Sequence, residues 1–308
     1  MILASLGATS GQNEATGFFH QSLSWSPDAS RLVFSAMRDR KTDLYAVNID
    51  GSGLTRLTEN VGNSVWPDFS PSGRQIAFQS DRVGGQADIW VMNADGGNPI
   101  QLTRDSGRNS YPSWSPDGKR IVFTSTRDGG QLLFVMKADG SNPARITSAT
   151  VDGTKYYNPV WSPKGNRIVF YSDKGDHTDQ ILVTSPDGSN QKVLTGGIGH
   201  NIYPSWLPDG KRIIFSTDRD GVRRMVYLIE ADGSDLNRFL GKATSSDAAR
   251  NPIGDGQGTA TQAVDSLNTF FLRWSPDGKR IAYIVGGYPK TQIYVMNADG
   301  SGSRLLIK

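Results

Sequence analysis

The chain has 308 residues, of which 36% are hydrophobic and 20% charged, with 35 glycines, 15 prolines and no cysteine. This composition indicates a folded protein rich in tight turns, and it excludes disulfide bonds and thiolate metal sites. The formal net charge is +3 and the basic residues are scattered along the chain, never more than two in a row, which argues against a nucleic-acid partner. No apolar stretch approaches the roughly 20 residues of a membrane-spanning helix, so no membrane span is predicted.

Residues 1–17 precede the repetitive part of the chain and are treated as a separate N-terminal segment. Residues 1–10 are apolar at first and then rich in small side chains. Two interpretations fit them: the remnant of a secretory signal, or an additional β-strand followed by a linker. The first places the protein in the periplasm or outside the cell. The alternative is the cytoplasm, and a chain without cysteine suits either compartment.

From residue 18 onward one sequence unit recurs six times, and its clearest copy runs Trp114-Ser-Pro-Asp-Gly-Lys-Arg-Ile-Val-Phe123. We call the aromatic residue that opens each copy the anchor; the six anchors are Trp25, Phe69, Trp114, Trp161, Trp206 and Trp274. Successive anchors are 44, 45, 47, 45 and 68 residues apart. Such a period predicts a repeat architecture that spans the chain.

Each unit is expected to contain four antiparallel strands. In the first unit, one strand ends at Trp25 and a Ser-Pro-Asp turn follows it. A strand that is apolar on both faces leads to Phe34, and a third strand runs through Leu44-Tyr-Ala-Val and ends at Asp50-Gly, a strong hairpin signal. A short fourth strand, Arg56-Leu-Thr, closes the unit. The same order repeats in the other five.

Four strands in units of about 45 residues predict an all-β fold, a six-bladed β-propeller over residues 18–308. A linear solenoid is the structural alternative. A solenoid needs distinct polar units at its two ends, whereas the first and last units here keep the same apolar pattern. The sequence therefore favours closure into a ring.

The pattern of an aromatic residue followed by Ser-Pro-Asp-Gly-Lys-x-Ile-x-Phe, a further apolar strand, Asp-Gly and a Leu-Thr ending resembles the repeat of the TolB-like (WD-repeat-like) propeller family. The resemblance covers nearly the whole chain from residue 18. It implies one of three roles: a periplasmic scaffold that binds a lipoprotein partner, a substrate-gating domain of a serine peptidase, or the catalytic body of a polysaccharide lyase.

Propellers bind ligands at the ends of the central channel, so the residues just before each anchor are candidates for a site. The position three residues before the anchor is aromatic in four of six units, and the positions five and six residues before it carry amides, bases and rings. The predicted ligand-binding residues are His20, Asn63, Trp66, Arg108, Asn109, Tyr111, Lys155, Tyr156, Asn158, His200, Asn201, Tyr203, Asn268 and Phe271. Such a mouth suits an anionic or sugar-like ligand or an extended peptide. The alternative is that the rings pack between blades and the polar groups satisfy loop backbone.

Two further features stand outside this set. A basic residue recurs thirteen positions after five of the anchors, as Arg38, Arg82, Arg127, Lys174 and Arg219. Repetition indicates a structural device, such as an ion pair between blades, because a unique site would not be repeated. The long gap before Trp274 holds an insertion, residues 241–268, that is predicted to be either a lid over the mouth or a neutral loop.

Catalytic motifs are sparse. No Gly-x-Ser-x-Gly motif occurs, and His20, His177 and His200 have no local metal-ligand spacing. The run from Asp173 to Asp179 is similar to a calcium loop but falls where a polar hairpin tip is expected.

We therefore predict no catalytic residue, metal or cofactor, and a monomeric scaffold that binds a protein, peptide or carbohydrate. The alternative is a lyase that uses bases and cations of the same mouth, namely His20, Arg108, Lys155, Tyr156 and His200.

Overall fold

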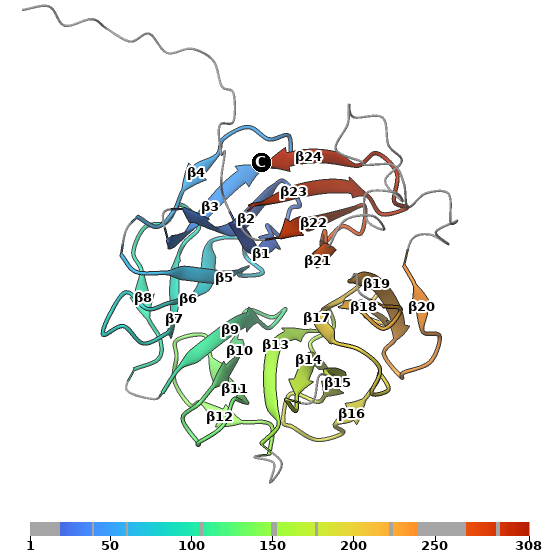
Figure 1. Ribbon diagram of the computed structural model, residues 1–308. Helices are drawn as coiled ribbons and strands as arrows, with labels where there is room; N and C mark the ends of the chain where they lie inside the picture. The colour runs from blue at the N-terminus through green and yellow to red at the C-terminus, as the bar shows by residue number, and fades with distance from the viewer. Residues whose placement is uncertain are drawn as a thin grey trace, which may run out of the picture.

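The computed structural model describes residues 19–38, 40–59, 61–104, 107–148, 153–175, 178–221, 224–239, 269–287 and 290–307, with the backbone alone at 19–21, 269–270 and 287. All the regular structure in these ranges is β-strand. It forms six four-stranded sheets, the blades, arranged around a common centre (Figure 1). The predicted all-β six-bladed propeller is confirmed. In the same ranges no helix has the length and apolar character needed to cross a membrane.

The innermost strand of each blade lies near the centre of the ring and ends at the anchor residue. These strands are β1 (Phe19–Trp25), β5 (Ser64–Phe69), β9 (Asn109–Trp114), β13 (Lys155–Trp161), β17 (Asn201–Trp206) and β21 (Thr269–Trp274). The second strands are β2 (Arg31–Arg38), β6 (Gln75–Ser80), β10 (Arg120–Ser125), β14 (Ile168–Asp173), β18 (Arg212–Thr217) and β22 (Arg280–Gly287).

The third and fourth strands complete each blade outward from the centre. The third strands are β3 (Lys41–Asn48), β7 (Asp88–Asn93), β11 (Leu132–Lys137), β15 (Gln180–Thr184), β19 (Met225–Glu230) and β23 (Lys290–Asn297). The fourth are β4 (Thr55–Arg56), β8 (Ile100–Gln101), β12 (Ala144–Arg145), β16 (Lys192–Val193), β20 (Asn237–Arg238) and β24 (Arg304–Ile307). Every pairing is antiparallel and joins strands that are consecutive in the chain.

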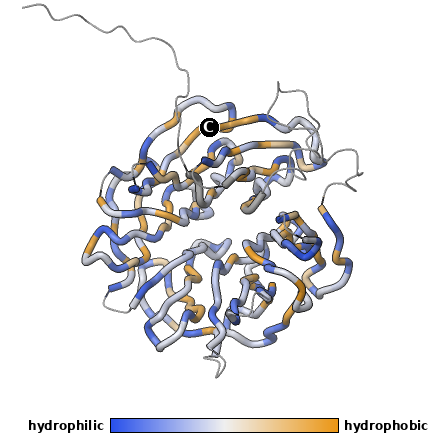
Figure 2. Tube along the Cα trace, viewed as in Figure 1, coloured by the Kyte–Doolittle hydropathy of each residue, from blue (hydrophilic) through white to orange (hydrophobic). Residues whose placement is uncertain are grey.

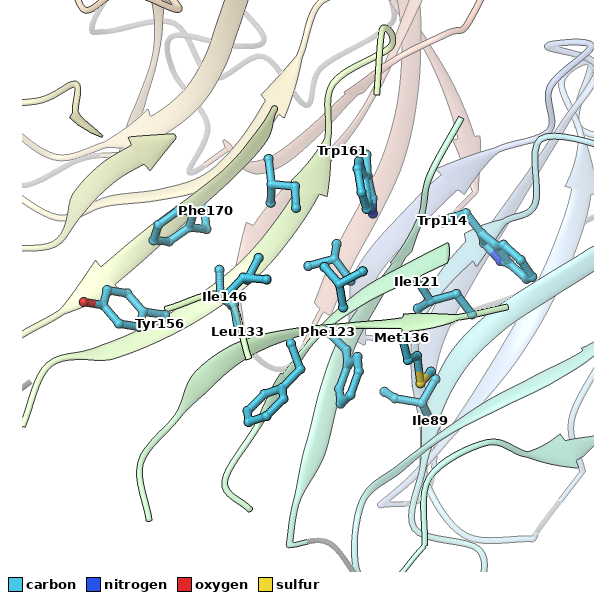
Figure 3. Packing of buried hydrophobic residues seen from close by; sticks show 14 of the residues in the cluster. Ile89, Trp114, Ile121, Phe123, Leu133, Met136, Ile146, Tyr156, Trp161 and Phe170 are labelled. Carbon is cyan, nitrogen blue, oxygen red and sulfur yellow. The ribbon is translucent and has the colours of Figure 1, made fainter. Parts of the chain in front are cut away.

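The core lies between neighbouring blades rather than in the centre of the ring. Figure 2 shows hydrophobic segments in every blade, interrupted by hydrophilic stretches. The second strands are buried on both faces, as predicted; Phe34, Phe78, Phe123, Phe170, Phe215 and Tyr283 occupy equivalent positions and are all at most 1% exposed. Figure 3 shows Phe123 of the third blade in one cluster with Ile89 of the second and Trp161 of the fourth. Contact between blades therefore holds the ring together.

Two recurrent motifs have clear structural roles. In the turn after Trp114, the Ser115 hydroxyl donates to Asp117 over 2.5 Å and accepts the Arg120 N–H over 2.9 Å, while Gly118 takes φ +67°. In the Leu-Thr ending, Thr103 Oγ1 accepts the Ile89 N–H of the third strand over 2.9 Å, and Thr58, Thr147 and Thr195 repeat this bond. The threonine thus extends the contact of a fourth strand that is only two residues long.

The ring closes without exchange of a described strand between blades. The first blade consists of β1–β4 and the sixth of β21–β24. At this seam Trp25 Nε1 donates to the Arg273 carbonyl over 2.9 Å. The joint between the fourth and fifth blades has the same bond, from Trp206 Nε1 to the Val160 carbonyl over 3.1 Å. The seam therefore reproduces an ordinary joint, and the linear alternative is wrong.

Candidate functional site

The innermost strands carry an interruption that turns side chains toward the channel. In four of them the residue three before the anchor has a positive φ and precedes proline: Trp66 (54°), Tyr111 (55°), Asn158 (49°) and Tyr203 (54°). The ladder register shifts at this point of each strand. Proline has no N–H to give to the ladder, and a left-handed residue before it costs about 1–3 kcal/mol. The same strained bulge is therefore repeated around the ring.

Side chains from five blades meet across the channel. We call them the aromatic layer; its members are Trp66, Tyr111, Tyr157, Tyr171, Tyr203 and Phe271. The Trp66 ring lies 4.6 Å from Tyr111, 6.0 Å from Tyr203 and 5.9 Å from Phe271, centroid to centroid. Because Trp66 belongs to the second blade and Tyr203 to the fifth, which faces it across a six-bladed ring, the aromatic layer spans the channel.

The tyrosines of the layer stay neutral. Burial raises the pKa of Tyr111, Tyr171 and Tyr203, and the positive charges of Arg108 and Arg224 only partly oppose this for Tyr111 and Tyr203. Arg108 precedes β9 and Arg224 precedes β19, both at the face of the ring where the innermost strands begin. We call this the proximal face and the opposite one the distal face.

A polar cavity of about 40 Å³ lies against the aromatic layer, farther along the innermost strands. Its lining includes Asp68 of β5, Asn158 of β13 and Arg273 of β21. Asp68 accepts the Trp114 N–H over 2.8 Å and the Ser24 hydroxyl over 3.1 Å, so it links three blades. The volume suits a few water-sized groups.

The cavity holds charges in an unfavourable setting. Burial raises the pKa of Asp68 to about 6, against which the Trp114 N–H, Ser24 and Arg273 act. Burial lowers the pKa of Arg273 to about 10, and its guanidinium lies 4.2 Å from the centre of the Phe271 ring. The buried Nδ2 of Asn158 has no hydrogen-bond partner among the described residues. Polar groups that cost folding free energy in a cavity are typical of functional sites.

The predicted site residues separate into three groups by their distance from the anchor. Those three positions before it reach the channel, as Trp66, Tyr111, Asn158, Tyr203 and Phe271. Of those five positions before it, Asn109, Tyr156 and Asn201 point into the joints between blades. Of those six positions before it, the described residues Asn63, Arg108, Lys155 and His200 lie on the proximal face. The structure therefore brings the first group together but does not unite all three.

The second group has protein partners. Asn109 is fully buried and donates to Asp88 Oδ1 over 2.9 Å. Asn201 is also fully buried and accepts from Arg219 Nη2 over 2.9 Å. Tyr156 is 4% exposed and packs edge-on against Phe170 in the core between blades (Figure 3). These three residues therefore have a structural role in the joints between blades, and they offer little surface to a ligand.

The third group is accessible in part. Arg108 and Lys155 are exposed. The exposed Asn63 binds Asp81 through its amide group over 2.9 Å. His200 Nδ1 lies 2.8 Å from Asp179 Oδ2, and burial raises the pKa of Asp179 against the effect of His200. The side chain of His20 and all of Asn268 lie outside the described residues, as do residues 1–17, the insertion 241–268 and His177.

Four described residues that bring a ring or a charge to the channel were not in the predicted set. Tyr157 and Tyr171 complete the aromatic layer, and Asp68 and Arg273 line the cavity. The last two stand one residue before their anchors, a position that holds serine or valine in the other four units. The sequence signal for Asp68 and Arg273 was a charged residue at a repeat position that is small or apolar in the other units.

Three of the recurrent basic residues, Arg82, Arg127 and Arg219, have structural contacts, although these contacts differ from the expected ion pair. The Arg219 guanidinium lies 5.0 Å from the Tyr227 ring centre and donates to Asn201 within its own blade. Arg82 lies 4.9 Å from both Phe78 and Trp90. Burial lowers the pKa of Arg82, and the more distant negative charge of Asp43 in the neighbouring blade partly opposes this decrease.

Comparison with known proteins fits this architecture. The family described as the TolB beta propeller domain matches residues 7–87 and 83–253. The chain belongs to this family. Relatives include an uncharacterized protein of Agrobacterium fabrum, 43% identical over 60 residues, which are 20% of each chain. The activity of that relative is therefore no guide to this TolB-like propeller.

Solved structures are similar over most of this propeller. TolB from Acinetobacter baumannii superimposes with a TM-score of 0.67 at 19% identity, covering 94% of this chain and 62% of that one. A putative TolB from Agrobacterium tumefaciens gives 0.66 at 23%, covering 91% and 90%. Oligogalacturonate lyase from Vibrio parahaemolyticus gives 0.60 at 14%, covering 95% and 79%. At these identities the likeness shows the fold alone, and this chain spans less than two thirds of the Acinetobacter protein.

Proposed function

We propose that this TolB-like propeller is a non-catalytic scaffold that binds an extended, carboxylate-bearing segment of a partner protein at its proximal face. The observation that carries the proposal is the coincidence, on that face, of exposed apolar side chains with cations whose side chains make no hydrogen bond or ion pair among the described residues. The fold supports a binding role in general, and the chemistry of this face supports the choice of partner.

Exposed apolar side chains come from three separate loops of the proximal face. Val61 and Ile198 lie in the connections that lead to β5 and β17 and are 46% and 65% exposed. Val83 lies between β6 and β7 and is 55% exposed. A single exposed apolar residue needs no explanation, but three brought to one face from separate loops favour an interaction surface.

The charges of the same face favour an acidic segment. Within the described part of the chain, the side chains of Arg108 and Lys155 make no hydrogen bond or ion pair. Carboxylates of the same face are already engaged: Asp81 accepts from Asn63, and Asp218 accepts the His200 N–H over 2.7 Å. Unpaired cations beside satisfied carboxylates attract negative charge.

The aromatic layer supports binding across the face rather than through the ring. Trp66, Tyr111 and Tyr203 pack on one another across the channel and so reduce the room for a peptide chain along the axis. The lyase alternative loses one of its groups because Tyr156 is buried between blades. A carbohydrate ligand remains the alternative for the same face.

Photo-crosslinking in the native host tests the partner and its site. p-Benzoylphenylalanine is placed at Val83 or Ile198, and at Val193 on the outer strand β16 as a matched exposed control. We expect one protein adduct from the two proximal positions, absent at Val193 and weakened about tenfold or more by the double change Arg108→Glu, Lys155→Glu. Equal adducts at Val193, or no effect of charge reversal, would reject the proposal.

Enzymatic activity and location are tested separately. Incubation with acidic oligosaccharides should give no ultraviolet-absorbing unsaturated product, and a product that disappears in His200→Ala would establish a lyase instead. We also propose that the protein works in the periplasm or outside the cell, the cytoplasm being the alternative. Cell fractionation with detection of the native protein decides between these compartments.

A further inference from the structure

The joint between the first and second blades differs from the others in its anchor residue. Five blades have tryptophan at this position, and the second has Phe69. The anchor ring of one blade reaches toward the preceding blade, so this exchange alters the contact between β5 and the first blade.

The contacts of the tryptophans show what the indole supplies. Trp25 and Trp206 donate Nε1–H to the carbonyl of the residue before the preceding blade's anchor, over 2.9 and 3.1 Å. Trp161 lies under the guanidinium of Arg120 of the preceding blade, 4.6 Å from ring centre to Cζ. At these joints an indole thus fills the space between blades and carries either a hydrogen bond or a cation–π contact.

At the exceptional joint a pocket of about 270 Å³ lies beside Phe69. Its walls come from the turn between β1 and β2 and the turn between β5 and β6; they are Ser26, Pro27, Asp28, Ser30, Arg31, Phe69, Ser72 and Gly73. Arg31 holds the place in its blade that Arg120 holds in the third. Within the described residues the Arg31 guanidinium has no hydrogen bond, ion pair or ring contact.

We propose that this pocket binds the side chain of a tryptophan presented by a partner protein, with the incoming indole taking the place of the missing anchor indole under Arg31. A phenyl ring leaves part of an indole-sized space open, and hydroxyls of Ser26, Ser30 and Ser72 can accept an indole N–H. The unpartnered guanidinium is available for stacking, as Arg120 stacks on Trp161.

The size and place of the pocket support a protein side chain as its source. The volume exceeds that of an indole ring and leaves room for the Cβ and backbone that carry it. The pocket is formed by turns that follow the innermost strands, so it lies on the distal face. It is therefore independent of the proximal site, and failure of one proposal leaves the other standing.

N-acetyltryptophanamide is the probe, with N-acetylleucinamide as the matched control, and binding is followed by the shift in melting temperature and by NMR titration. We expect saturable, millimolar binding of the tryptophan probe to the wild type. The variant Phe69→Trp supplies the missing indole from the chain itself and should reduce the affinity about tenfold or more. Arg31→Gln should weaken it about fivefold through loss of the stacking cation.

A reciprocal variant tests the structural argument. Trp161→Phe should open an equivalent pocket under Arg120 and raise the number of bound probes from one to two. Equal binding by wild type and Phe69→Trp would overturn the site. Binding of free indole without binding of N-acetyltryptophanamide would assign the pocket to small aromatic molecules and overturn the choice of a protein side chain.

Discussion

Two adjacent levels of the central channel are built in opposite ways. In the aromatic layer, rings from neighbouring and facing blades pack on one another, as Trp66 does on Tyr111 and Tyr203. In the cavity beside it, Asp68 and Arg273 are partly buried charges, and an Asn158 amide lacks a partner among the described residues. The aromatic layer stabilises the propeller because its aromatic side chains pack on one another. The polar groups of the cavity cost folding free energy, so a contribution to stability does not explain their presence.

The largest expected effect is on the aromatic layer. Trp66→Ala removes the ring that contacts Tyr111, Tyr203 and Phe271 and should lower the free energy of unfolding by about 3–5 kcal/mol. Urea denaturation measures this, with the exposed Val61→Ala as a control that should change stability by less than about 0.5 kcal/mol. A loss below 1 kcal/mol for Trp66→Ala would mean that the layer does not hold the blades together.

An intermediate effect, dependent on pH, is expected in the cavity. The folded-state pKa of Asp68, about 6, lies above its ordinary value of 3.8, so the folded wild type binds this proton more tightly than the unfolded chain. The contribution of Asp68 to stability therefore decreases as pH rises from about 4 to about 6. Relative to wild type, Asp68→Asn should gain up to about 3 kcal/mol between pH 4 and pH 7. Urea denaturation across this range measures the difference, and a difference independent of pH would show that folding does not raise the pKa of Asp68.

The smallest effect on stability is expected for Asn158 of the cavity, whose backbone has a positive φ similar to that of Tyr111 of the aromatic layer. Asn158→Gly relieves a residue at φ +49° and removes an amide without a partner, so its stability should stay within about 1 kcal/mol of wild type. Tyr111→Gly relieves the similar φ of +55° but removes a ring of the aromatic layer. It should lower the free energy of unfolding by several kcal/mol, as the loss of a large packed side chain usually does. Parallel denaturation curves compare the two, and equal losses would show that the backbone rather than the side chain determines both.

The fold could be predicted from the sequence because the repeat is explicit. The anchor, the Ser-Pro-Asp-Gly turn and the Asp-Gly hairpin each mark a strand end, and the strands end there in all six blades. The closure of the ring was only favoured, because a seam that repeats an ordinary joint has no local signature of its own.

The candidate site was predicted less well, for a reason of side-chain direction. Successive residues of a strand point to opposite sides, so positions five and six before the anchor could not both face the mouth. Asn109 and Tyr156 accordingly lie in joints, whereas Arg108 and Lys155 are exposed. The bulge then lets the position three before the anchor reach the channel, and no simple alternation predicts that change of direction.

The seam has a consequence for the order of folding. Every ladder joins strands consecutive in the chain, so each blade can form from local contacts, whereas the Trp25–Arg273 bond connects residues 248 positions apart. Closing so long a loop is entropically costly, and long-range contacts slow folding. We expect six blades to assemble in sequence and the first and last to meet late. The seam between the first and sixth blades has the same hydrogen bond as another joint, yet its formation would then be the slow step of folding.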